Sequence, residues 1–293
     1  MMINIFISLL DIKYIKIILI LINIMDSPSN SLYDLLLYIT SCIQPRSTLE
    51  YNEIDAFDQT LYNNMKQDAI ILVKNNTIPT LKGRDYLTIN DNIILRKNFP
   101  MELEWLNKDD SLNFAKNNDP IYMRLQPPPY ETVNHTFIIS KIITATNKHN
   151  NSVYVEYGVR SGENLEMISK LVNKSYGVDL CDYNPKNENI TFHKMLTDTY
   201  SELILPKLNY DYAFIDADHS CNQVLIDFEN IYKYINKGGY IFLHDTYPCL
   251  EILLRPEYCN NCYLVPIKIR EKYPDIEMIT LPLNPGLTII RKN

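Results

Sequence analysis

Residues Tyr210–Tyr247 read YDYAFIDADHSCNQVLIDFENIYKYINKGGYIFLHDTY, and this segment has the clearest pattern of the chain. It contains two short apolar runs, Ala213–Ile215 and Tyr240–Leu243, and each run stops abruptly at acids and a histidine. A helix-like segment lies between the runs and closes at Lys237-Gly238-Gly239. This pattern predicts a strand, a helix and a second strand that lies parallel to the first.

The polar residues that follow the two runs are the first candidates for chemistry. Asp216, Asp218 and His219 follow the first run, and His244 and Asp245 follow the second. In an open α/β sheet, ligands bind just beyond the carboxyl ends of parallel strands, so we expect these side chains to serve a functional site. The alternative interpretation is that the acids only cap the helices that follow the strands.

Composition limits the classes of function. The chain has 293 residues, of which 46% are hydrophobic and 22% charged, as in ordinary globular proteins. The net charge of -7 disfavours a nucleic-acid partner, because such binding draws on clustered Lys and Arg. Six scattered cysteines indicate a reducing compartment, and we expect a cytoplasmic protein. The spacing of Cys259 and Cys262 is C-x-x-C, but without a second such pair we interpret them as structural thiols.

Residues 1–24 form an apolar extension whose role the sequence leaves open. Asp11, Lys13 and Lys16 interrupt it before it reaches the roughly 20 apolar residues that a membrane-spanning helix needs. Three interpretations stand side by side: a loose extension ahead of a start at Met25, a helix packed on the protein, or a membrane anchor.

Residues 25–126 are expected to form a mainly helical accessory or lid domain. Helical spacing of apolar residues predicts helices that begin near Ser27, span Ala56–Lys74 and span Glu102–Lys116. The runs Tyr86–Ile89 and Asn92–Leu95 predict a small hairpin.

A run of three prolines, Pro127-Pro128-Pro129, marks a domain boundary, because consecutive prolines forbid a helix across them. A helix is expected from Glu131 to Asn147. Strand and helix patterns then alternate up to residue 243, and two further strands are expected at Glu277–Leu281 and Leu287–Ile290. This alternation predicts a doubly wound, mostly parallel α/β sheet in residues 130–293.

The first strand of this domain, Val153–Tyr157, leads into a glycine loop. Gly158 and Gly162 allow a ligand to approach the backbone, but Arg160 stands where the dinucleotide fingerprint has its second glycine. Glu156 just before the loop repels phosphates and can accept hydrogen bonds from an ammonium group. Asp179 follows about twenty residues later, where ribose hydroxyls are typically held. The combination favours a cationic ligand with a ribose and no phosphates, against the alternative of a plain strand-to-helix turn.

At this point the sequence resembles the class I S-adenosylmethionine-dependent methyltransferases, in particular the branch called methyltransferase family 24. The shared pattern is Ile215-Asp216-Ala217-Asp218-His219-Ser220, then Val224 and Asp227, then Lys237-Gly238-Gly239 and His244-Asp245. The chain departs from the family at Ala217, where glycine is usual, at Cys221, where an aromatic residue is usual, and at Val159. The resemblance runs from about Thr132 to Lys292 and covers nothing before Pro120.

The resemblance implies a role for each matched residue. Glu156, Gly158 and Gly162 would line the methionine part of S-adenosylmethionine, Asp179 its ribose and Asp198 its adenine region, with Asp216 beside them. Related O-methyltransferases hold a divalent cation with an acid after the fourth strand and an acidic pair after the fifth. The matching residues here are Asp216, His244 and Asp245.

Two versions of the chemistry remain open from the sequence. A cation, Mg²⁺ or, because a histidine is present, Mn²⁺, would lower the pKa of a substrate hydroxyl. Alternatively, His219 would act beside Asp216 as a metal-free general base. Structural roles at the ends of the sheet are the remaining interpretation of His219 and His244.

The sequence therefore predicts an enzyme that uses S-adenosylmethionine to methylate an oxygen of a small hydroxylated molecule such as a sugar. The alternatives are a non-catalytic cofactor-binding or interaction module on the same fold, or a methyltransferase of macromolecules. The expected partner is a small-molecule acceptor. Neither nucleic acid nor a membrane is expected as a partner, unless residues 1–24 act as an anchor. Association into a homo-oligomer is left open. The identity of the acceptor would depend on the N-terminal region and on loops, where no motif helps.

Overall fold

The computed structural model describes residues 48–52, 70–74, 85–89, 92–96, 135–147, 151–248, 251–281 and 285–293. By its internal contacts the chain divides into residues 1–30 and residues 31–293, and every described residue lies in the second unit. The expectations for residues 1–24, for the helices near Ser27 and at Glu102–Lys116, and for the proline boundary fall outside the described residues.

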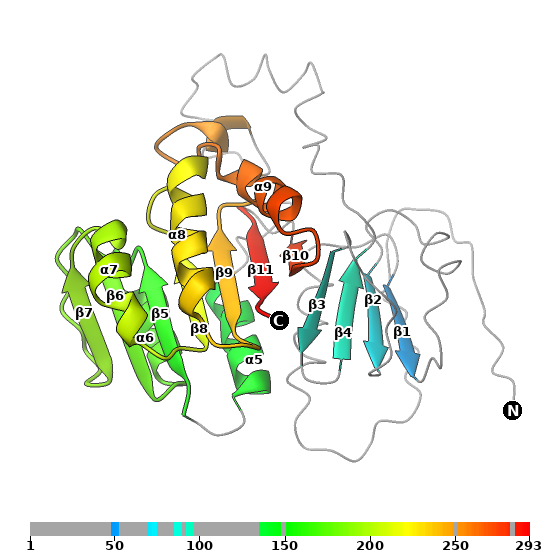
Figure 1. The fold of residues 1–293 in the computed structure, drawn as a ribbon, viewed down its shortest axis with the longest axis horizontal. Helices are drawn as coiled ribbons and strands as arrows, with labels where there is room; N and C mark the ends of the chain where they lie inside the picture. Colours follow the sequence, from blue (N-terminus) through cyan, green and yellow to red (C-terminus); the bar gives the residue numbers. More distant parts are fainter. Residues whose placement is uncertain are drawn as a thin grey trace, which may run out of the picture. The chain divides into compact units, whose positions relative to one another are not determined.

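A seven-stranded sheet forms the centre of residues 135–293 (Figure 1). Its order is β10-β11-β9-β8-β5-β6-β7, with β5 to β9 parallel to one another and β11 antiparallel to both β9 and β10. This is the doubly wound, mostly parallel sheet that the sequence predicted. The strands are β5 (Val153–Tyr157), β6 (Lys174–Asp179), β7 (Ile190–Lys194), β8 (Tyr212–Ile215), β9 (Tyr240–His244), β10 (Glu277–Leu281) and β11 (Leu287–Arg291).

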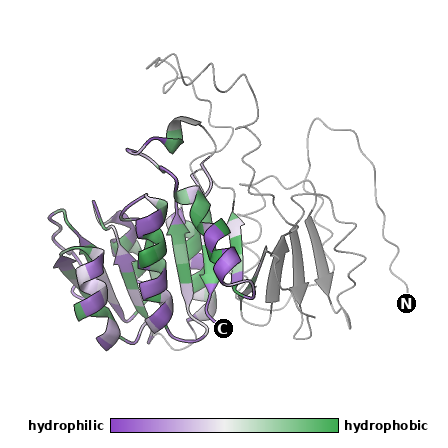
Figure 2. Ribbon diagram, turned by 45° about the horizontal axis from the view of Figure 1, so that its top comes forward, coloured by the Kyte–Doolittle hydropathy of each residue, from purple (hydrophilic) through white to green (hydrophobic). Residues whose placement is uncertain are grey.

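Both faces of the central strands are buried, which explains why these strands are continuous apolar runs in the sequence. In β8, Tyr212 and Phe214 belong to the core on one face, and Ala213 and Ile215 belong to the core on the other. The same period of two is found in β9. The resulting apolar character of the central strands is visible in Figure 2.

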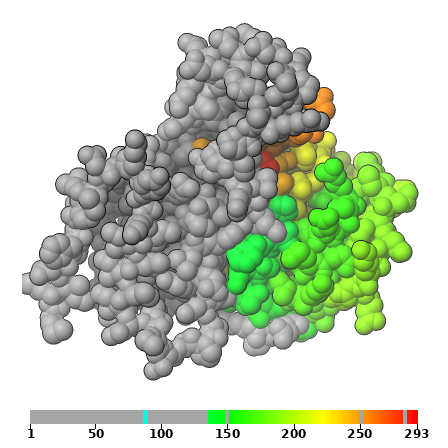
Figure 3. Space-filling model, turned by 180° about the vertical axis from the view of Figure 1, so that it is seen from behind, coloured from blue at the N-terminus to red at the C-terminus, as the bar shows by residue number. Residues whose placement is uncertain are grey.

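Helices cover the two faces of the sheet. Buried residues of α5 (His135–Thr146) and α6 (Glu163–Ser169) belong to one core, and those of α7 (Thr197–Leu203), α8 (Cys221–Tyr234) and α9 (Val265–Lys272) belong to the other. Seen from behind, the green atoms of the segment from α5 to α7 form part of the outer surface (Figure 3). None of the described helices is long and apolar enough to cross a membrane. Short 3-10 turns complete this region: η2 (Leu205–Lys207), η3 (Glu251–Leu254) and η4 (Cys262–Leu264).

The order of the strands reverses between β5 and β8. From β5 the chain proceeds outward to β6 and β7, and it then returns to place β8 and β9 on the other side of β5. In such sheets the crevice at the point of reversal binds ligands. A ligand site is therefore expected at the residues that follow β5 and β8.

The described part of the N-terminal region is a four-stranded sheet, and the expectation of a mainly helical domain is wrong for these segments. The sheet has the order β1-β2-β4-β3, with β1 (Thr48–Asn52) parallel to β2 (Ile70–Lys74). The predicted helix at Ala56–Lys74 fails at its end, because residues 70–73 are a continuous Ile-Ile-Leu-Val run that suits a strand. The predicted hairpin is confirmed: β3 (Asp85–Ile89) pairs antiparallel with β4 (Asn92–Arg96).

Strand β3 is attached to the larger sheet by side-chain hydrogen bonds. The hydroxyl of Tyr240 donates to the carbonyl oxygen of Thr88 at 2.6 Å, and the backbone N–H of Thr88 donates to the carboxylate of Glu277 at 3.1 Å. Leu87 and Ile89 are buried in the same core as α5.

Candidate active site

The glycine loop after β5 lies directly against the end of β8. Gly158 has a φ of +88°, and a Cβ at this position would lie 2.1 Å from the backbone oxygen of Asp216. Gly162 has a φ of +79°, and a Cβ there would lie 2.1 Å from the ring of Tyr183. These positions need glycine both for the left-handed backbone and for the close approach. The loop therefore brings the ends of β5 and β8 together at the switch point.

A buried hydrogen-bonded group surrounds Glu156 at the end of β5. Its Oε2 accepts hydrogen bonds from the hydroxyl of Tyr154 and from the side-chain amide of Asn164, both at 2.6 Å. Burial raises the pKa of Glu156 to about 8, although both hydrogen bonds act in the opposite direction. Among the described residues, the buried Oδ1 of Asn164 has no hydrogen-bond partner. A ligand that brings an ammonium group here would supply the missing donors and favour the charged form of Glu156.

Asp179, at the end of β6, is tied to the glycine loop. Its Oδ2 accepts a hydrogen bond from the backbone N–H of Arg160 at 2.6 Å, and its Oδ1 accepts one from Cys181 at 2.8 Å. The acid predicted to hold ribose hydroxyls thus lies beside the loop predicted to hold the rest of the cofactor.

Two acids and two histidines converge beyond the ends of β8 and β9. His219 Nε2 lies 3.2 Å from Asp245 Oδ2 and 3.5 Å from Asp216 Oδ1. His244 Nδ1 lies 3.1 Å from Asp216 Oδ1 and 3.2 Å from Asp245 Oδ1. Asp245 has a φ of +60°, a left-handed conformation that is uncommon outside glycine. We refer to Asp216, His219, His244 and Asp245 as the carboxylate–imidazole cluster.

The charges in this cluster depend on one another. Burial raises the pKa of Asp216, but the charge of His244 and the hydrogen bonds from both histidines outweigh it, so the pKa lies below its ordinary value. The hydrogen bond with Asp216 raises the pKa of His219 to about 9 against the effect of burial. Burial lowers the pKa of His244, but the charge of Asp216 and its hydrogen bond prevail and raise it to about 9. With no other cation present, imidazolium groups balance the two carboxylates.

The same geometry suits a bound cation. The ligand atoms of Asp216, His219 and Asp245 lie within 4.8 Å of one another, and they are the group among the described residues that could hold a metal ion. The sequence predicted His244 as the histidine of the metal set, whereas this group of ligand atoms contains His219 in its place. Two carboxylates with an imidazole fit Mn²⁺, Fe²⁺ or Zn²⁺ better than Mg²⁺, which prefers oxygen ligands alone.

The sequence-based reasoning missed His135, the first residue of α5. Its ring stacks on Phe214 with centroids 5.2 Å apart and lies 4.4 Å from the ring of His244. Burial lowers the pKa of His135 to about 4, and the nearby His244 adds to this effect, so the ring is neutral at physiological pH. No motif marks this residue, and only its position at the start of a helix that packs on the sheet brings it to the cluster.

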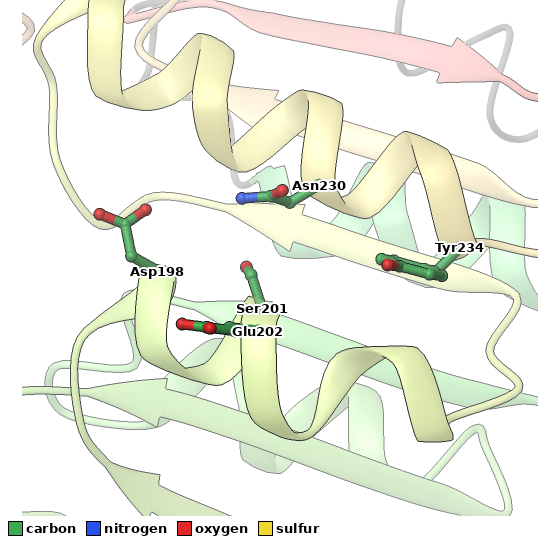
Figure 4. Close-up of a pocket in the computed structure, with 5 residues that line it drawn as sticks. All are labelled: Asp198, Ser201, Glu202, Asn230 and Tyr234. Atoms are coloured by element: carbon green, nitrogen blue, oxygen red, sulfur yellow. The ribbon is translucent and has the colours of Figure 1, made fainter.

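Asp198, the residue predicted to lie beside adenine, is hydrogen-bonded to a residue of α8. It is exposed on α7, and its Oδ1 accepts a hydrogen bond from Gln223 of α8 at 3.0 Å. It lines a shallow groove of about 340 Å³ between these helices, together with Ser201, Glu202, Asn230 and Tyr234 (Figure 4). Its predicted role beside adenine stays a prediction.

Comparison with known proteins shows what this domain is similar to. A family model described as a methyltransferase domain matches residues 155–246, the segment that contains the glycine loop and the carboxylate–imidazole cluster. This segment is therefore similar to a methyltransferase domain. An uncharacterized protein of Acanthamoeba polyphaga mimivirus is 32% identical over 128 residues, covering 37% of this chain and 58% of that protein. The chain therefore spans less than two thirds of the length of this relative.

Solved structures similar to this chain include two methyltransferases bound to S-adenosylhomocysteine (SAH). The first is PaMTH1 of Podospora anserina, with 15% identity, coverage of 63% of this chain and 86% of that chain, and a TM-score of 0.41. The second is an O-methyltransferase from Bacillus cereus, with 13% identity, coverage of 64% and 93%, and a TM-score of 0.43.

Proposed function

We propose that this protein transfers a methyl group from S-adenosylmethionine to an oxygen of a small hydroxylated molecule. The observation that carries the proposal is the meeting of two unlike groups at the switch point of the sheet. On one side lies a glycine loop with a buried acid, and on the other lies the carboxylate–imidazole cluster. Gly158 joins the two, because its backbone is in close contact with Asp216.

The loop side has the groups that the cofactor requires. Glu156 and the unpartnered Oδ1 of Asn164 would hold the ammonium of the methionine part, and Asp179 would accept hydrogen bonds from ribose hydroxyls. Gly158 and Gly162 leave room for the cofactor, and Asp198 is proposed to serve its adenine region. When bound, S-adenosylmethionine supplies a methyl group on a sulfonium, which an oxygen nucleophile can attack.

The cluster side has the groups that an acceptor hydroxyl requires. Asp216 and Asp245 would accept its hydrogen bond, and His219 presents Nε2 between the two carboxylates. At neutral pH a pKa of about 9 keeps this ring protonated, so it becomes a general base only after the carboxylate charge is balanced in another way. A divalent cation held by Asp216, Asp245 and a histidine would balance that charge and favour the ionised hydroxyl.

The acceptor class follows from the chemistry of the cluster. Carboxylates and imidazoles bind hydroxyl groups well, and two carboxylates repel phosphate groups. A net charge of -7 also opposes binding to nucleic acid. We therefore favour a neutral polyhydroxylated molecule, such as a sugar, over a nucleic acid.

Two measurements test the proposal. Isothermal titration of the full chain with SAH should give a saturable binding isotherm, and its absence would refute the cofactor assignment. Transfer of a radiolabelled methyl group should then be followed separately into the small-molecule and macromolecule fractions of a lysate. Label in small molecules supports the proposal. Label in macromolecules, or binding of SAH without any transfer, would favour one of the two alternatives, a macromolecular methyltransferase or a non-catalytic module.

A further inference from the structure

The C-x-x-C segment, whose cysteines were expected to be structural thiols, forms a turn against the carboxylate–imidazole cluster. We call residues 258–262 the 258–262 turn. The backbone N–H of Cys262 donates to the carbonyl of Cys259 at 3.0 Å, which closes the turn. Both thiols are buried, with 2% of each residue exposed. Four of the five residues of the turn contact a cluster residue or the start of α8.

The first contact fixes one ring nitrogen of His219. Its Nδ1 is hydrogen-bonded to the backbone carbonyl of Tyr258. A carbonyl oxygen can only accept a hydrogen bond, so Nδ1 must carry the proton. The ring therefore turns its other nitrogen, Nε2, toward Asp245 and Asp216. An N–H to carbonyl bond of this kind is the usual way in which a protein fixes the tautomer and direction of a functional imidazole.

The second contact locks the turn to the start of α8. The side-chain oxygen of Asn261 accepts a hydrogen bond from the backbone N–H of Cys221 at 2.7 Å. Cys221 is the first residue of α8, and the N-cap residue Ser220 makes no capping hydrogen bond through its side chain. Asn261 thus satisfies one of the four backbone N–H groups that the start of a helix leaves without an intrahelical partner. Because His219 lies two residues before Cys221, this bond holds the imidazole and its carbonyl partner in one rigid arrangement.

The thiols make the remaining contacts. The side chain of Cys259 is hydrogen-bonded to the carboxylate of Asp245, and the thiol of Cys262 donates to the backbone carbonyl of His244 at 3.4 Å. Cys221, Cys259 and Cys262 are buried and form no disulfides with one another. The C-x-x-C pair is thereby explained: both thiols are buried and make weak hydrogen bonds to cluster residues.

We propose that the 258–262 turn positions the acceptor side of the site, and that Asn261, by anchoring the turn to α8, holds His219 with Nδ1–H toward Tyr258 and Nε2 toward the two carboxylates. Asn261 and the two thiols are positioning residues, because they act through His219, Asp245 and His244. The proposal rests on the proposed methyltransferase function for its kinetic consequence only, because the orientation of the ring can be measured without activity.

The test uses Asn261→Ala, which removes the acceptor, and Asn261→Asp, which keeps an oxygen at the same place and adds a charge that a helix N-terminus favours. Glu257→Ala, at an exposed neighbour outside the turn, is the matched control. Imidazole ¹H–¹⁵N spectra recorded above pH 9, where the ring of His219 is neutral, report its tautomer. Titration with SAH reports cofactor binding, and methyl transfer reports kcat/KM.

We expect wild type, Asn261→Asp and Glu257→Ala to show the Nδ1–H tautomer of His219. Asn261→Ala should lose the uniform tautomer and about tenfold in kcat/KM, since small misplacement of a reacting group is costly, while SAH affinity stays within about twofold. An unchanged spectrum in Asn261→Ala, or an equal loss in Glu257→Ala, would overturn the proposal. If Asn261→Ala does not fold, the wild-type spectrum and Asn261→Asp decide, and an Nε2–H tautomer in wild type refutes the arrangement. Failure of wild type to bind SAH would refute the proposed function and leave the spectroscopic test intact.

Discussion

Replacement of Gly158 by alanine should push the glycine loop, on the cofactor side of the site, away from Asp216 on the acceptor side. The new Cβ would lie 2.1 Å from the backbone oxygen of Asp216, which is 1.3 Å inside the 3.4 Å at which ordinary contact begins. The three nearest atoms to this Cβ belong to the backbone of Asp216 and Ala217 and cannot rotate away. The glycine loop or the end of β8 must therefore move by about 1.3 Å. Misplacement by about 1 Å can cost on the order of 100-fold in rate. We expect a loss of this size in methyl transfer and a clear loss of SAH affinity.

Gly238→Ala is the matched control for this change. Its φ of +79° is close to the +88° of Gly158, so both variants carry a similar backbone strain of roughly 1–2 kcal/mol. The nearest atom to the Cβ of Gly238→Ala, however, is Nη2 of Arg291 at 3.8 Å, which is an ordinary contact with a side chain. Denaturant unfolding gives the stability of each variant, and titration with SAH gives its affinity. Equal losses of stability, affinity and rate in the two variants would show that contact with Asp216 is not what requires glycine at position 158.

Three further changes test other parts of the site and fold. Asp216→Asn and Asp245→Asn should each lower methyl transfer by about 100-fold, while SAH affinity changes by less than about threefold. A strong chelator should have the same effect on the wild-type protein. Full activity in the presence of chelator would refute the role of a cation. Burial raises the pKa of Glu156 from 4.5 to about 8, so the folded protein holds a proton that the unfolded chain loses, and the free energy of unfolding should fall as pH rises through this window. Glu156→Gln should flatten that slope in denaturant titrations at a series of pH values, and an unchanged slope would contradict the assignment. Tyr240→Phe removes the hydrogen bond to Thr88, so unfolding should become easier by about 1 kcal/mol, and no change would mean that this bond contributes nothing.

The parts of the fold that could be predicted are those with local signals. Strands β8 and β9 are short apolar runs that end in polar residues, and β5 leads into a glycine loop, so their positions follow from periodicity and turn residues. Strand β2 could not be predicted, because apolar residues at Phe57, Leu61 and Met65 have helical spacing and the apolar run that follows them is consistent with the same helix. Tertiary pairing with β1 and β4 decides that segment.

The candidate site could be predicted only where its residues follow strands. Asp216, His219, His244 and Asp245 converge because β8 and β9 are neighbours, and neighbouring strands lie about 4.8 Å apart. His135 and Asn261 could not be predicted in the same way. His135 reaches His244 through the packing of a helix, and Asn261 reaches Cys221 from 40 residues further along the chain. Both contacts exist only after the chain has folded.

Strand β10 has a consequence for any attempt to study the methyltransferase domain alone. It is an edge strand of the seven-stranded sheet, and unpaired edges invite other chains to pair with them and aggregate. In this protein the edge carries Glu277, a charged residue with 6% of its surface exposed, which pairs with Arg291 and accepts a hydrogen bond from Thr88 of β3. A chain shortened to begin after β4 would lose β3 as a partner and expose β10, whose five residues are Glu277, one threonine and three apolar residues. Low solubility of such a fragment would therefore reflect the exposed edge and would say nothing against the integrity of the site.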